Sequence, residues 1–124
     1  MPTVTVKIRQ NQQTQAYHMS VEPPRLPVPG TDTTTITFKL DQGTLSGWQF
    51  LTTAATDEFY GVTISGDDGT VFNTPQRTSD TQIQFQDLNS SATTYSYSVE
   101  ITNPGLNLSL GVDPTIDNRS NTEP

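Results

Sequence analysis

The chain has 124 residues and a net charge of −7, with 13 acidic side chains against six lysines and arginines. Binding to nucleic acids or anionic membranes requires clustered cations that displace counterions, so the sequence argues against both as partners. With no cysteine and one histidine, the chain also excludes disulfides, thiolate chemistry and a multi-histidine metal site, and we expect no cofactor.

The composition favours one domain over residues 1–124 that is built from strands and turns. Hydrophobic residues make up 31% of the chain, which also has nine prolines and eight glycines. This mixture is poor in the residues that favour helices and suits short, half-buried strands. Neither a membrane-spanning apolar stretch nor a signal peptide is visible, so we expect a cytoplasmic protein.

In the first half of the chain, apolar and polar residues alternate in short segments, as in strands with one buried face. These segments are 3–8, 17–21, 35–40, 47–52 and 59–64. Between the second and third lies EPPRLPVPG at 22–30, whose prolines cannot donate hydrogen bonds to a neighbouring strand. We therefore expect an extended crossover or an edge segment there.

In the second half, SGDDGT at 65–70 predicts a hairpin turn. The expected strands that follow are 71–73, 82–88, 93–102 and 106–112. No segment has a convincing helical pattern. The whole chain thus predicts an all-β fold, an antiparallel β-sandwich of immunoglobulin-like proportions with about eight or nine strands.

Several polar or aromatic features have ordinary structural explanations. His18 lies at a polar position of its strand, which favours an exposed side chain. Residues 65–70 lack the spacing of a calcium loop, and the acidic pair at 57–58 fits a solvated loop. The tyrosines at 95–97 share the parity of Val99 and Ile101, so a core position is favoured over a sugar-binding platform.

Asp113–Pro114 is the candidate site, because its chemistry is intramolecular. The Asp113 carboxylate is tethered to the carbonyl carbon that it would attack, and ring closure gives a cyclic anhydride while Pro114 leaves as an amine. Tethering contributes about 7–11 kcal/mol when the reactive geometry is enforced. The fold must also donate a proton to the departing nitrogen or stabilise the oxyanion.

The closing segment GVDPTIDNRSNTEP, with Asp-Pro at 113–114 and Glu-Pro at 123–124, resembles that of the DP-EP family of small gammaproteobacterial proteins. The resemblance implies a β-sandwich that cleaves its own Asp-Pro bond. It also implies that the released peptide, here Pro114–Pro124, stays docked as a partner of the remaining chain, and that the freed aspartate can become linked to a lysine. Carried over, Asp113 is the attacking residue and Pro114 the first residue of the peptide.

The lysines of this chain put the cross-linking step in doubt. Lys7 and Lys39 are its only lysines, and both are far from Asp113 in the sequence. A hairpin centred on 103–105 would place Asp113 near Tyr95 and Ser96, where there is no amine. We therefore expect cleavage followed by hydrolysis, unless folding brings a lysine close.

The resemblance also requires a second acid that activates water or shuttles protons. In the same hairpin Glu100 would pair near Leu108, about 13–17 Å from Asp113 and too far for direct proton transfer. Asp57, or its neighbour Glu58, would serve if their loop caps the same end of the sandwich, and we select Asp57. Asp117 is the alternative if the tail turns back.

A function from another class competes with this prediction. The chain would then be a non-catalytic β-sandwich for binding or for self-assembly through exposed edge strands, with Asp113–Pro114 only a turn. An exposed aromatic platform or a long unpaired edge would favour that alternative.

Overall fold

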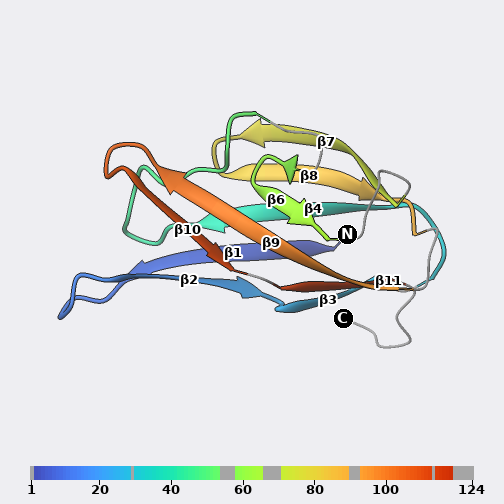
Figure 1. Ribbon diagram of the computed structural model, residues 1–124, viewed down its shortest axis with the longest axis horizontal. Coiled ribbons are helices and arrows are strands. Elements are labelled where there is room, and N and C mark those ends of the chain that lie inside the picture. Colours follow the sequence, from blue (N-terminus) through green and yellow to red (C-terminus); the bar gives the residue numbers. More distant parts are fainter. Residues whose placement is uncertain are drawn as a thin grey trace.

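The computed structural model describes residues 2–28, 30–53, 58–65, 71–89, 93–112 and 114–118 (Figure 1). Within these ranges it has eleven strands and no helix, so the all-β prediction is confirmed. The strands are β1 (Thr3–Gln10), β2 (Tyr17–Glu22), β3 (Arg25–Val28), β4 (Thr34–Asp41), β5 (Glu58–Phe59), β6 (Val62–Ile64), β7 (Phe72–Ser79), β8 (Gln82–Asp87), β9 (Thr94–Asn103), β10 (Leu108–Val112) and β11 (Thr115–Asn118).

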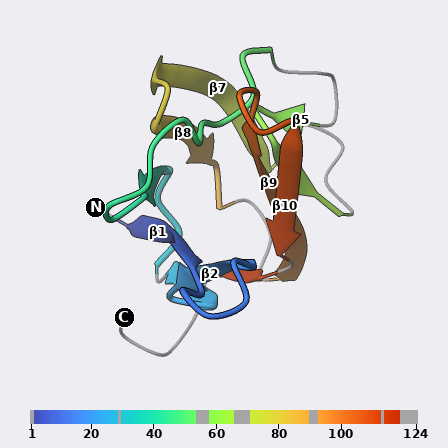
Figure 2. The same ribbon diagram turned by 90° about the vertical axis from the view of Figure 1, so that its left-hand side faces the viewer.

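The strands form two sheets that face each other across the core (Figure 2). One sheet has five strands in the order β2-β1-β4-β8-β7. The other has six, in the order β3-β11-β9-β6-β5, with β10 also paired to β9. This is the expected sandwich, with long β9 at the centre of the second sheet.

The sandwich is not wholly antiparallel, which corrects one part of the prediction. β1 pairs with β4 in parallel, and β11 pairs with β3 in parallel. The proline segment explains both pairs, since the chain leaves the first sheet after β2, adds β3 to the edge of the second sheet and then returns as β4. The expectation of an edge segment at 22–30 is thus confirmed for β3.

The strand count also differs from about eight or nine, for local reasons. Residues 47–52 form no strand beyond an isolated bridge between Gln49 and Thr102, although Trp48 and Phe50 are both buried as expected. Strands β3, β5 and β11 are additional to those predicted. Each of the three is short, with two to four residues.

The core follows the predicted alternation. Val99 and Ile101 of β9 are fully buried, and Tyr97 is 2% exposed. Phe38 of β4 stacks on Phe85 of the neighbouring strand β8. It also contacts the ring of Tyr97 from the opposite sheet edge-on, with ring centroids 5.6 Å apart. Apolar burial of this kind is the main stabilising term of the fold.

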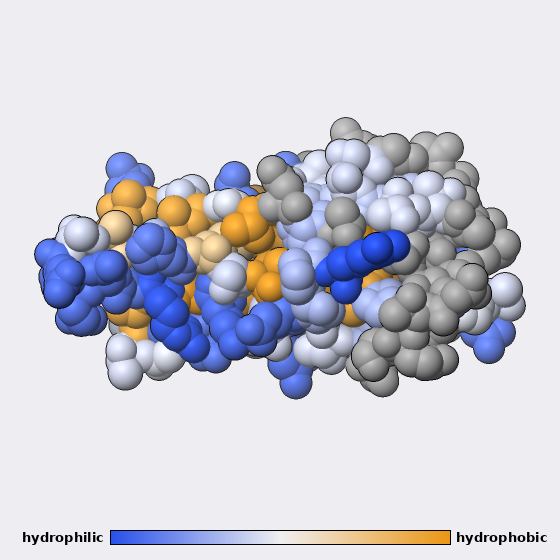
Figure 3. Space-filling model, turned by 90° about the horizontal axis from the view of Figure 1, so that it is seen from below, coloured by the Kyte–Doolittle hydropathy of each residue, from blue (hydrophilic) through white to orange (hydrophobic). Residues whose placement is uncertain are grey.

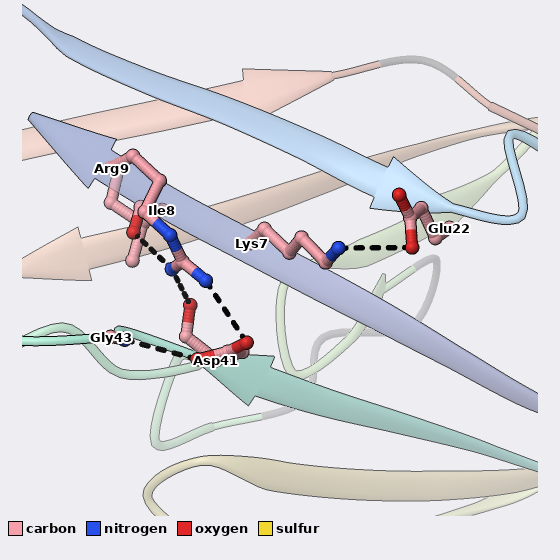
Figure 4. Close-up of polar contacts among 6 residues, drawn as sticks. All are labelled: Lys7, Ile8, Arg9, Glu22, Asp41 and Gly43. Atoms are coloured by element: carbon pink, nitrogen blue, oxygen red, sulfur yellow. Dashed lines mark hydrogen bonds and ion pairs between the residues drawn. The ribbon is translucent and has the colours of Figure 1, made fainter.

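Polar side chains cover the outer face of the five-stranded sheet near the end of β1 (Figure 4). The Arg9 guanidinium donates hydrogen bonds to the Asp41 carboxylate, at 3.1 Å, and to the Asp41 carbonyl, at 2.9 Å. The backbone N–H of Gly43 donates to the same carboxylate at 3.0 Å. These contacts join β1 to the end of the parallel neighbour β4.

The Gly43 hydrogen bond, and then Arg9, lower the pKa of Asp41 below its ordinary value. A lowered folded-state pKa means that this carboxylate stabilises the fold above its unfolded pKa, and that the contribution is lost as the pH falls through the folded value. An NMR titration should therefore find the Asp41 midpoint below that of a model peptide, and Arg9→Gln should move it upward. An Asp41 midpoint that does not change in Arg9→Gln would contradict the assignment of Arg9 as a cause.

Candidate functional site

The Asp113–Pro114 bond joins two strands that run along the same edge of β9. Asp113 itself lies outside the described residues, but its neighbours Val112 and Pro114 are described. Val112 pairs with Val99 at the end of β10, and Thr115 pairs with Ser96 at the start of β11. From the first pair to the second, the chain advances three residues on each side, from 112 to 115 and from 99 to 96. β10 and β11 therefore pair with β9 in the same register.

Proline explains why one strand is divided into two. The backbone N–H of Tyr97 donates a hydrogen bond to the Pro114 carbonyl at 3.0 Å. In a hydrogen-bonded antiparallel pair each residue donates its N–H to the carbonyl of the other. Pro114 cannot donate to the Tyr97 carbonyl, because proline has no N–H. The ladder is therefore interrupted at Pro114, next to the candidate scissile bond.

The segment after the bond is held on both sides. β11 lies between β9 and β3, where Ile116 pairs with Tyr95 on one side and with Leu26 on the other. The Ile116 side chain is 0% exposed, and Pro114 is buried as well. In the intact chain the first residues of the tail are therefore held between two strands.

The register of β10 on β9 differs by three residues from the hairpin predicted from the sequence. The turn spans 104–107, with Asn107 at a φ of 55° and with the Leu106 N–H donating to the Asn103 carbonyl. Leu108 therefore pairs with Asn103, and Gly111 with Glu100. A four-residue turn uses more chain than a turn centred on 103–105, and this moves every later pair.

The corrected register brings one acid closer to the bond than predicted. Glu100 pairs with Gly111, which precedes Asp113 by two residues, or about 7 Å of strand. Its side chain is exposed on the outer face of β9. Two β9 residues, Tyr97 and Ser98, lie between the pairs that flank the bond, and of these Ser98 faces the same outer side as Glu100. Glu100 is thus the nearest carboxylate that the pairing of described residues identifies.

The other acids are placed differently. Asp57, the selected second acid, lies outside the described residues, so its role remains a prediction. Its neighbour Glu58 pairs with Thr63, which pairs with Ser98. Glu58 is therefore two strands away from β9. Asp117 continues along β9 opposite Thr94, so the tail does not turn back there, and the alternative that required such a turn is wrong.

Neither lysine is brought to the site. Lys7 and Lys39 belong to β1 and β4 of the five-stranded sheet, whereas Val112 and Pro114 lie along β9 of the other sheet. The Lys7 ammonium forms an ion pair with Glu22 at 3.0 Å (Figure 4). Lys39 is exposed. Both alternate with buried residues of their strands and so point away from the core.

Tyr97, whose backbone N–H bonds the Pro114 carbonyl, also carries a polar side-chain group that the sequence prediction treated only as core. Its hydroxyl is buried, and within the described residues it has no hydrogen-bond partner. Burial disfavours the phenolate and raises the Tyr97 pKa well above its ordinary value. The side chain therefore stays neutral, with an O–H that can donate. The sequence signal was the tyrosine itself, since a buried tyrosine usually bonds its hydroxyl.

The remaining features agree with their ordinary explanations where they are described. His18 is exposed on β2, opposite Arg9. Residues 66–70 lie outside the described ranges, so the expected hairpin turn is not described. Within the described part of the chain, no three His, Asp or Glu side chains lie close enough to hold a metal ion, and no helix could span a membrane.

Comparisons with known proteins do not assign the chain to a family. No family model matches it, and no curated protein matches it either. The resemblance to the DP-EP family therefore remains a prediction.

Proposed function

We propose that this protein cleaves its own Asp113–Pro114 bond. The observation that supports the proposal is the position of Pro114, whose carbonyl is held by the Tyr97 N–H while the flanking residues Val112 and Thr115 are paired to β9. Pairing on both sides restricts the backbone around the bond. Restriction of this kind is what a tethered reaction needs to exceed its slow rate in a flexible peptide.

The proposed chemistry needs only the chain and water. A carboxylate oxygen of Asp113 bonds to the carbonyl carbon of the same residue, and the C–N bond to Pro114 breaks. The nitrogen takes up a proton and becomes the secondary amine of a new N-terminus. Water then opens the five-membered anhydride, which leaves Asp113 with two carboxyl groups. The event happens once per molecule.

The structure supports particular assisting groups. Glu100 is exposed and pairs with Gly111, two residues before Asp113. It is therefore a candidate base for the water that opens the anhydride. Asp57 remains the second candidate from the sequence. Since both lysines face away from the core on the opposite sheet, hydrolysis is favoured over a cross-link.

Intact-mass spectrometry under denaturing conditions tests the proposal. Purified protein kept at neutral pH should resolve into residues 1–113 and 114–124. Asp113→Asn should remain whole or cleave much more slowly, because it lacks the carboxylate. Asp80→Asn is the matched control, since this acid is exposed and bonds Arg77 at the β7–β8 turn. It should cleave like the wild type.

Two outcomes would contradict self-cleavage. One is a wild-type chain that keeps a single mass for weeks, which would leave a non-catalytic binding or assembly module as the function. The other is equal cleavage of Asp113→Asn. If cleavage occurs, Glu100→Gln should slow the reaction, while an unchanged rate would direct attention to Asp57.

A further inference from the structure

Among the described strands, the edges of the two sheets differ in how they are protected from pairing with another strand. β7 contains Pro75 and two register irregularities, and β3 contains Pro27. β5 has two residues. β2 carries His18 and Glu22. Prolines, bulges, charges and shortness are the devices by which natural sheets prevent edge association.

β10 has none of the sequence devices. The backbone hydrogen bonds of β9 show which of its N–H groups face β10. The Tyr97 N–H bonds Pro114, on the side of β9 where β10 lies, whereas the Glu100 and Thr102 N–H groups bond Gly61 and Gln49 on the other side. The β10 residues that pair with odd-numbered β9 residues are 108, 110 and 112, and these direct their backbone groups to β9. Ser109 and Gly111 therefore direct theirs outward.

The same edge is apolar and uncharged. Residues 104–112 contain no charged side chain. Leu106 and Leu108, 47% and 41% exposed, are the exposed large hydrophobic residues of the described chain. β10 contacts β2 of the other sheet, which has three half-buried apolar residues, Tyr17, Met19 and Val21. Figure 3 shows the molecule from below, with hydrophobic residues gathered in its left half. β2 and β10 lie in the same half in Figure 1.

The available edge has a defined length. At one end the chain enters β10 from the turn at 104–107. At the other end β3 occupies the outer side of β11, beginning with the pair of Arg25 and Thr115. Between these limits lie the five residues of β10. The described edge open to an added strand is therefore β10 itself.

We infer that the occupant of this edge is the β10 strand of a second copy of the chain, paired antiparallel about Leu110. Ser109 lies opposite the partner's Gly111, and Gly111 opposite the partner's Ser109, so all four outward N–H groups and all four carbonyls are used. This register is self-complementary, as a two-fold dimer requires. The apolar side chains of both strands then lie on the core-facing side, over β2.

Charge is consistent with a second copy at this edge. Each chain carries −7, so two copies repel each other unless their contact excludes the charges. In the proposed register Glu100 and the partner's Glu100 are separated by three strand spacings and two residues, about 16 Å, which exceeds the screening length of about 8 Å at physiological salt. The repulsion between the two Glu100 side chains is therefore small. Added salt should strengthen the dimer, because it screens the repulsion between the remaining negative charges of the two chains.

The small contact makes the dimer weak. Five paired residues bury less than the roughly 1,200 Å² of a standard stable interface. The dimer should therefore appear only at high concentration, between about 100 µM and 1 mM.

Sedimentation equilibrium of Asp113→Asn, used so that the chain stays whole, tests the inference. The mass should rise towards that of a dimer as the concentration approaches about 1 mM, and more so in about 0.5 M NaCl than in 0.05 M. Ser109→Pro removes an outward N–H without touching the bonds to β9 and should abolish the rise, whereas Ser109→Ala should retain it. Circular dichroism checks that both variants fold.

Amide exchange locates the contact. The Ser109 and Gly111 amides should become slower to exchange as the concentration rises, while Leu110, already bonded to β9, should change little. A monomer at all concentrations, or a dimer that Ser109→Pro leaves intact, would overturn the inference. Capture of an extended peptide from another protein instead of a second copy would appear as the first of these outcomes.

Discussion

Ile116→Ala is expected to lower the free energy of unfolding by about 2–5 kcal/mol, the usual cost of removing a large buried aliphatic side chain. Ile116 is 0% exposed and sits in β11 between Tyr95 of β9 and Leu26 of β3. Truncation leaves a cavity between two strands that cannot easily close, because β11 is held by both neighbours. Urea unfolding followed by tryptophan fluorescence, with Trp48 as the probe, measures the change.

Leu108→Ala is the matched control, because Leu108 projects from the same edge of β9 on the same side. Its side chain is 41% exposed, so its truncation removes less buried area and should cost under about 1.5 kcal/mol. If the two variants lose equal stability, the tail does not dock as described. In cleaved wild-type protein the same burial should keep 114–124 bound through gel filtration, and Ile116→Ala should release it.

Gly61→Ala is expected to cost about 2–4 kcal/mol, because two separate penalties meet at this residue. Its φ of 99° is one that L side chains rarely adopt. A Cβ atom there would also lie 2.5 Å from the Glu100 carbonyl oxygen. The Glu100 N–H bonds the Gly61 carbonyl at 2.9 Å, so the two backbones cannot separate without losing a hydrogen bond.

Gly30→Ala separates the two penalties. Gly30 has a φ of 77°, but no atom lies within 4 Å of the position of an added Cβ. Its substitution should therefore carry only the conformational cost of about 1–2 kcal/mol. The difference between the variants in thermal or urea unfolding measures the close approach of β6 and β9. Equal losses would mean that β9 moves freely away from Gly61.

Local patterning predicted the strands that bury alternate side chains. Val4, Val6 and Ile8 of β1 are fully buried as their spacing indicated, and so are Val99 and Ile101 of β9. The pattern failed where a segment is buried without being a strand, as for Trp48, and where a strand is too short to show a period, as for β5. The prolines at 22–30 left a crossover and an edge segment both open, and β3 tolerates Pro27 because a strand at an edge needs few ladder donors.

The candidate bond was visible in the sequence, but its surroundings were not. The position of Glu100 relative to Asp113 depends on the turn at 104–107, where a different turn length shifts every pair along β9. A segment such as 103–107 is compatible with several turn lengths, so its residues do not choose the register. The uncharged edge of β10 was also invisible, because an edge is defined by which strands are absent beside it.

The sequence by itself determined the all-β class, the buried face of the long strands and the presence of an Asp-Pro bond before an apolar tail. These follow from side-chain alternation and from chemistry within neighbouring residues. Only the tertiary structure decided that Pro114 lies against Tyr97 and that both lysines belong to the other sheet. It also decided that, among the described strands, β10 pairs with β9 alone. The physical reason is that strand neighbours are chosen by closing two sheets over one core, which joins residues far apart in the chain.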